Sequence, residues 1–99
     1  MVLNDKIRNE LSTLCKLHKV GSLYLIGSAV GANFHKNSDV DFLIKFENIA
    51  LSDYFNNYFT LKEKLEELFK RKVDLVEEQT LKNPILIQSI NSSKELVYG

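Results

Sequence analysis

The stretch Ser38-Asp39-Val40-Asp41-Phe42-Leu43-Ile44-Lys45-Phe46 has an apolar residue at every second position from Val40 onward. The intervening positions begin with two aspartates, Asp39 and Asp41. Successive side chains of a β-strand point to opposite faces of the sheet. We therefore predict a strand that begins at Asp39, with one face in the core and both carboxylates on the other face.

Three further stretches have the composition of strands. They are the apolar run 23–26, which is stopped by Gly27, the apolar run 73–76, which contains the single acid Asp74, and the C-terminal run 94–98. Apolar runs bounded by glycine or charged residues are typical of short, buried strands. We expect a turn at 20–22, before the first of these strands.

The remaining segments have helical spacing or helix-capping residues. From Leu3 onward apolar residues recur every three or four positions, which predicts a first helix that ends near His18. Thr60 with Glu63 forms a capping-box pattern and predicts a second helix that starts at Thr60. Residues 52–58 are ambiguous, and a short helical turn followed by a loop is expected between positions 29 and 38.

A short helix capped by Asn83 and opened by Pro84 completes the pattern. Helices alternate with strands along the whole chain, which predicts the fold class α/β (α+β): a mixed β-sheet of about four strands flanked by helices. At 99 residues the chain is long enough for one compact core and too short for two ordinary domains. We expect a single domain over residues 1–99.

Charge and composition exclude several classes of function. The 13 basic and 13 acidic residues balance, so the sequence does not favour nucleic acid as a partner. Cys15 is the only cysteine, which is typical of a reducing compartment, and core packing is its expected role. No apolar stretch approaches the length of a membrane span, so we expect a cytoplasmic protein with no membrane partner. A homo-oligomer is left open.

The two aspartates at the strand opening predict a metal site. Residues two apart on a strand have Cα atoms about 6.5–7 Å apart and share a face, so Asp39 and Asp41 can flank Mg²⁺ or Mn²⁺. Asp74 would supply a third carboxylate if its strand paired beside theirs. Gly27 and Ser28 follow a strand directly, where backbone amides and a hydroxyl can bind phosphate.

Gly27-Ser28, followed after a gap by Ser38-Asp39-Val40-Asp41 and an apolar run, resembles the signature of the DNA polymerase β-type nucleotidyltransferase superfamily. The short length and the preceding helix resemble its MNT, or minimal nucleotidyltransferase, group. The resemblance implies a nucleotidyltransferase fold and transfer of AMP from ATP to a hydroxyl. It also implies an antitoxin-like pairing with a HEPN-domain toxin.

By this resemblance the acids Asp39, Asp41 and Asp74 are catalytic and bind metal, and Gly27 with Ser28 binds the nucleotide. Many relatives carry an arginine four residues after the first glycine, where this chain has Gly31. Lys36 or Lys45 could replace its charge. Two readings stay open: an active transferase, and a non-catalytic antitoxin subunit that acts by direct contact with its partner.

The aromatic residues between 54 and 59 admit two roles, base stacking or partner docking on one hand and core packing on the other. Of the two roles, core packing beneath a helix is the one we expect. The members of this group are Tyr54, Phe55, Tyr58 and Phe59.

Overall fold

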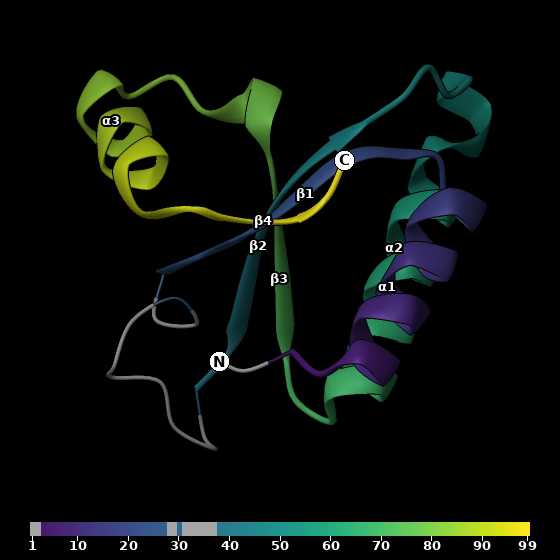
Figure 1. Ribbon diagram of the computed structural model, residues 1–99. Helices are drawn as coiled ribbons and strands as arrows, with labels where there is room; N and C mark the ends of the chain where they lie inside the picture. Colours follow the sequence, from purple (N-terminus) through teal and green to yellow (C-terminus); the bar gives the residue numbers. More distant parts are fainter. Residues whose placement is uncertain (1–2, 28–29, 31–37) are drawn as a thin grey trace.

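The computed structural model describes residues 3–27, 30 and 38–99, and it confirms the predicted mixed α/β architecture (Figure 1). In chain order the elements are α1 (Asp5–Leu17), β1 (Val20–Ile26), β2 (Val40–Phe46), α2 (Leu51–Phe69), β3 (Val73–Glu77), a short 3-10 helix (Glu78–Thr80), α3 (Pro84–Ser93) and β4 (Glu95–Tyr98). The turn and loop expected between 29 and 38 lie, apart from Val30 and Ser38, outside the described residues.

The four strands form one sheet in the order β3-β2-β1-β4. β1 runs antiparallel to β2 and to β4, whereas β2 and β3 are parallel. A parallel pair cannot be joined by a tight turn, and α2 provides the crossover between β2 and β3. Both strands therefore begin at the same end of the sheet, with the predicted acids near their starts.

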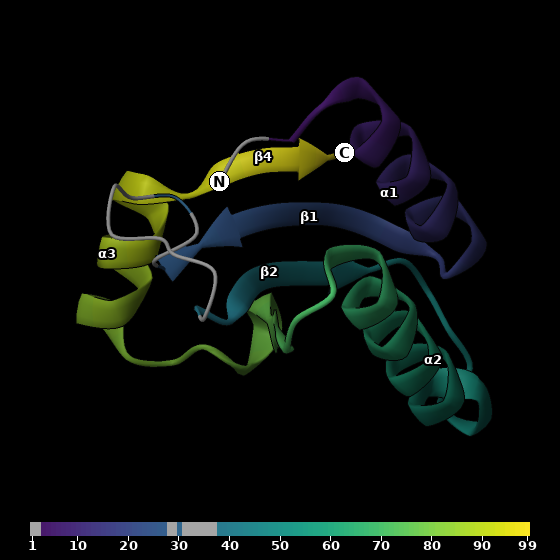
Figure 2. The ribbon, with the colours of Figure 1, turned by 90° about the horizontal axis from the view of Figure 1, so that it is seen from below.

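One face of the sheet is covered and forms the core. Figure 1 shows α1 and α2 together on this side of the sheet and α3 on the opposite side, and the turned view of Figure 2 shows the same separation of α3 from α1 and α2. The core side chains come from alternate strand positions and from the inner faces of the two helices, and they include Leu11, Cys15, Leu23, Leu25, Val40, Phe42, Ile44, Leu61 and Leu65. The predicted core face of the 38–46 stretch is confirmed, and burial raises the pKa of the Cys15 thiol to about 12.

Two predicted boundaries were wrong by more than one residue. The residues expected as a turn at 20–22 already belong to β1, and a register shift between Val20 and Ser22 accommodates them. The chain reverses one step earlier, at Lys19, whose φ is 55°. The second predicted helix starts at Leu51 rather than at Thr60, and its N-cap, Ala50, makes no side-chain capping bond.

Aromatic packing explains the early start of α2. Tyr54 and Tyr58 stand one helical turn apart with stacked rings, and both contact Phe46 at the end of β2. Core packing was therefore correct for Tyr58, which is partly buried against the core. It was wrong for Phe55 and Phe59, which are 64% and 59% exposed.

Side chains obstruct the outer edge of the sheet at β3. The Val73 amide donates to the Glu66 carboxylate, and the Tyr58 hydroxyl donates to the carbonyl of Leu75. The Thr80 hydroxyl donates to the carbonyl of Glu77. Covering an edge strand in this way prevents another strand from pairing with it.

Within the described part of the chain, no helix combines the length and the apolar composition needed to cross a bilayer. The buried residues of α1 and of α2 lie one helical turn apart on one face of each helix, as Leu61 and Leu65 of α2 illustrate.

We predict that Leu61→Ala lowers the free energy of unfolding by about 2–5 kcal/mol, because the Leu61 side chain is fully buried between α2 and the sheet. Leu51→Ala is the matched control in the same helix. Leu51 is 80% exposed, so its truncation should change stability by less than about 0.5 kcal/mol. Urea denaturation followed by circular dichroism measures both, and equal effects would contradict the assigned core.

Candidate active site

The register of the parallel strands brings two of the predicted acids together. Asp41 of β2 is the direct partner of Asp74 of β3, just as Val40 is the partner of Val73. Partners on adjacent strands lie about 4.8 Å apart and point to the same face. That face is the one opposite α1 and α2, since Val40 and Phe42 point into the core. The Asp74 side chain is exposed, because β3 is an edge strand.

Asp39 lies one residue before β2 and is exposed. The backbone on either side of it is tied to the turn between α2 and β3. The Arg71 guanidinium donates to the carbonyl of Ser38 at 3.1 Å, and the Val40 amide donates to the carbonyl of Lys72 at 3.0 Å. The turn that precedes Asp74 thus also positions Asp39.

Gly27 lies against the Asp41 carboxylate from the other neighbouring strand. It directly follows Ile26, which is the register partner of Asp41, and its φ is +67°. A Cβ atom at this position would come within 2.8 Å of Asp41 Oδ2. Both the backbone conformation and the contact therefore require glycine here. Ser28, the other predicted nucleotide-binding residue, lies outside the described residues.

Mutual repulsion marks the three acids as one electrostatic group. The pKa of Asp41 is raised above its usual value by burial first, then by the negative charges of Asp74 and Asp39. A nearby cation relieves this kind of strain by favouring the ionised form. The Tyr58 hydroxyl, below β3, has a raised pKa for the same two reasons, burial and the charges of Asp74 and Glu77.

The donor set fits a hard divalent cation. Carboxylate oxygens are the ligands that Mg²⁺ prefers, and Mg²⁺ is commonly held by one or two carboxylates together with substrate phosphates and water. Among the described residues, no three His, Cys, Asp or Glu side chains are grouped closely enough to hold an ion by themselves. The adjacent Asp41 and Asp74, completed by a polyphosphate, match the open type of magnesium site.

Neither lysine suggested as a substitute for the family arginine is placed at the acids. Lys36 lies outside the described residues, and Lys45 lies four residues beyond Asp41 on β2, about 13 Å away by the strand rise. Sequence reasoning missed Arg71, the cation that does contact the Asp39 segment. Arg71 lies in the run Lys70-Arg71-Lys72, and spacing alone does not show which side chain of that run turns toward the sheet.

Comparisons with known proteins give a family model and a relative that match this chain. The family model described as "Polymerase beta, Nucleotidyltransferase" matches residues 8–99. The chain is 32% identical over 96 residues to the Methanocaldococcus jannaschii protein named "Putative protein adenylyltransferase MJ0128", a match that covers 97% of this chain and 93% of that protein.

Two solved structures show the same fold. One, described as a "putative minimal nucleotidyltransferase", is 28% identical with a TM-score of 0.72, and the match covers 88% of this chain and 85% of that one. The other is the complex of a tri-AMPylated Shewanella oneidensis HEPN toxin with an MNT antitoxin. It is 20% identical with a TM-score of 0.57, and the match covers 93% of this chain and 69% of that one.

We predict that Gly27→Ala lowers the free energy of unfolding by about 1–2 kcal/mol, because alanine is strained at positive φ. It should also weaken binding of ATP with Mg²⁺, since the new methyl group displaces the Asp41 carboxylate. Gly21→Ala, near the other end of β1 and against the backbone of Lys45, is the control and should leave nucleotide binding unchanged. Isothermal titration calorimetry that shows wild-type affinity for Gly27→Ala would contradict this role.

Arg71→Met should lower stability by about 0.5–1.5 kcal/mol through the lost hydrogen bond to Ser38. It should also speed amide hydrogen exchange at Asp39 and Val40. Arg8→Met is the matched control, because Arg8 likewise donates to a backbone carbonyl, that of Leu3, far along the chain from the acids. If exchange at Asp39 and Val40 is the same in both variants, Arg71 does not position this segment.

Proposed function

Because this chain belongs to the polymerase β nucleotidyltransferase family, we propose that it transfers AMP from ATP to a hydroxyl group of a partner protein. The observation that supports this most directly is the pairing of Asp41 with Asp74, with the side-chain-free Gly27 against the Asp41 carboxylate. A nucleotidyltransferase needs carboxylates to hold metal and room beside them for the nucleotide. Asp41 and Asp74 supply the carboxylates, and Gly27, which has no side chain, leaves room beside Asp41.

In the proposed reaction Asp39, Asp41 and Asp74 are the catalytic and metal-binding residues, and Gly27 with Ser28 holds the nucleotide. Mg²⁺ or Mn²⁺ bound there would neutralise phosphate charge and lower the pKa of the attacking hydroxyl. Asp41, flanked by Gly27 and Asp74, would face the triphosphate side of the site. Asp74, exposed at the sheet edge, is open to an acceptor that approaches from solvent.

The proposed step is a displacement at the α-phosphorus of ATP. The acceptor oxygen forms a bond to the α-phosphorus, and the bond from that phosphorus to the bridging oxygen of the β-phosphate breaks. Pyrophosphate leaves with the electron pair, and the hydroxyl proton passes to the Asp74 carboxylate and then to water. The exposure of Asp74 favours both the approach of the hydroxyl and the loss of the proton to solvent.

The partner we propose is a HEPN-domain protein, for which the chain would act as an antitoxin. The structural relative in complex with an AMPylated HEPN toxin supports both the partner and the transferred group. The balanced charge of the chain supports a protein rather than a nucleic acid as the acceptor. The alternative, a non-catalytic antitoxin that acts by contact alone, does not account for an acid placed in an apolar strand opposite a second acid.

We expect ATP to bind weakly without a divalent ion, because the triphosphate and the three carboxylates repel one another, and more tightly with Mg²⁺. Incubation of the cognate partner with the chain, ATP and Mg²⁺ should add about 329 Da for each AMP transferred, as measured by intact-mass spectrometry. The double variant Asp39→Ala/Asp41→Ala should abolish this gain.

Asp5→Ala, which removes an acid from the first turn of α1, is the control and should retain transfer. The contact-only alternative wins if the partner gains no nucleotide mass and is neutralised equally by the wild type and by the double variant.

A further inference from the structure

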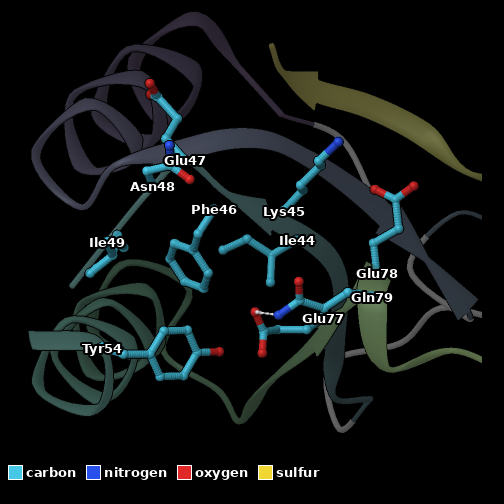
Figure 3. Close-up of a pocket in the computed structure, with 10 residues that line it drawn as sticks. All are labelled: Ile44, Lys45, Phe46, Glu47, Asn48, Ile49, Tyr54, Glu77, Glu78 and Gln79. Carbon is cyan, nitrogen blue, oxygen red and sulfur yellow. Dashed lines mark hydrogen bonds between the residues drawn. The ribbon is translucent and has the colours of Figure 1, made fainter. Parts of the chain in front are cut away.

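A hollow lined by described residues that the proposed chemistry does not use lies at the opposite ends of β2 and β3 from the acids. It has a volume of about 500 Å³ and is bounded by the last residues of both strands, the segment after β2 and the start of α2 (Figure 3). Phe46 and Tyr54 form one wall, with ring centroids 5.8 Å apart and ring planes at 78°. The hollow is therefore partly aromatic.

Its charged residues are unbalanced. Three carboxylates, those of Glu47, Glu77 and Glu78, line it against the single ammonium of Lys45. None of the three forms an ion pair within 4 Å with a described lysine or arginine, as the surface pair of Lys64 and Glu67 does. Negative charge beside aromatic faces is the environment in which a cationic group binds.

The Glu77 carboxylate accepts hydrogen bonds from two neighbouring side chains and can accept more. Figure 3 shows the Tyr54 hydroxyl directed at the Glu77 carboxylate and the Gln79 amide bonded to it at 3.4 Å. The pKa of the Tyr54 phenol is raised by burial first, then by its own hydrogen bond to the Glu77 carboxylate and by the charge of Glu77, so the phenol remains a donor. A carboxylate can accept about four hydrogen bonds, so about two acceptor positions remain for a ligand.

We propose that this hollow binds an arginine side chain of the acceptor protein. The planar guanidinium would lie against the aromatic wall and donate a two-pronged hydrogen bond to Glu77, a geometry that an ammonium group cannot reproduce. That the arginine belongs to the acceptor protein rests on the proposed function. That the ligand is an arginine rests on the residues of the hollow alone.

The strands fix the separation between the two sites. Asp74 and Glu77 are three residues apart on β3, and Asp41 and Lys45 are four apart on β2. At the rise of a β-strand these intervals span about 10 and 13 Å. Because side chains alternate along a strand, Asp74 and Glu77 point to opposite faces of the sheet. An acceptor that reaches both sites must therefore pass over the edge strand β3.

The binding chemistry is tested on the full chain by two-dimensional NMR titration with N-acetyl-L-arginine amide. The citrulline analogue, of equal shape but neutral, is the control ligand. The arginine compound should shift the amide signals of Tyr54, Glu77 and Gln79, and the citrulline compound should not. Glu77→Gln should weaken binding about tenfold, as expected for a lost hydrogen bond to a charged group.

Glu95→Gln, an exposed acid on β4, is the matched control and should bind like the wild type. Glu78→Gln, which removes a lining charge without disturbing the Tyr54 hydroxyl, keeps the test valid if Glu77→Gln is unfolded, and it should also weaken binding. Equal shifts with citrulline, unchanged affinity in these lining variants, or shifts confined to Asp39, Asp41 and Asp74 would each overturn the proposal.

A kinetic comparison separates this inference from the proposed function. With the cognate partner as acceptor, Glu77→Gln should raise KM for the partner about tenfold and leave kcat unchanged, because the hollow lies away from the reacting atoms. If AMP is transferred but arginine does not bind, the inference fails and the proposed function stands. If arginine binds and no AMP is transferred, the proposed function fails, and of the inference only the binding of arginine in the hollow stands.

Discussion

The parallel pairing of β2 with β3 is the constraint on which the rest of the site depends. Its register sets Asp41 beside Asp74, and a slip of one residue would send one of the two carboxylates into the apolar core. Core residues on both strands hold the register, since Val40 and Val73 are also partners and both are buried. The hydrophobic effect thus fixes the positions of two charges that repel one another.

Local patterns were sufficient to predict the strands and both faces of β2, because alternation in a strand is encoded by neighbouring residues. They were insufficient for the start of α2. The capping-box pattern at Thr60 lies in the middle of that helix, and the contacts of Tyr54 and Tyr58 with Phe46 extend it toward its N-terminus. Such contacts join residues of separate elements, which periodicity does not reveal.

The candidate site, like the fold, could be predicted from the sequence only in part. Asp39, Asp41 and Asp74 could be selected from sequence, because their residue types and strand positions suit metal chemistry. The adjacency of Asp41 and Asp74 depended on α2 acting as the crossover, and the bond from Arg71 to Ser38 depended on how the following turn folds. The close approach of Gly27 to Asp41 could be expected only in outline, from a glycine after a strand.

The obstructed edge at β3 also governs how copies of this chain can associate. With Val73 and Leu75 bonded to side chains of α2, growth of the sheet by an added strand is confined to the other edge, β4. If two copies pair through their β4 edges, each copy has used its one available edge, so the assembly stops at a symmetric dimer. An open fibre would need two free edges. The α2 side chains that bond to β3 therefore also oppose polymerisation by strand pairing.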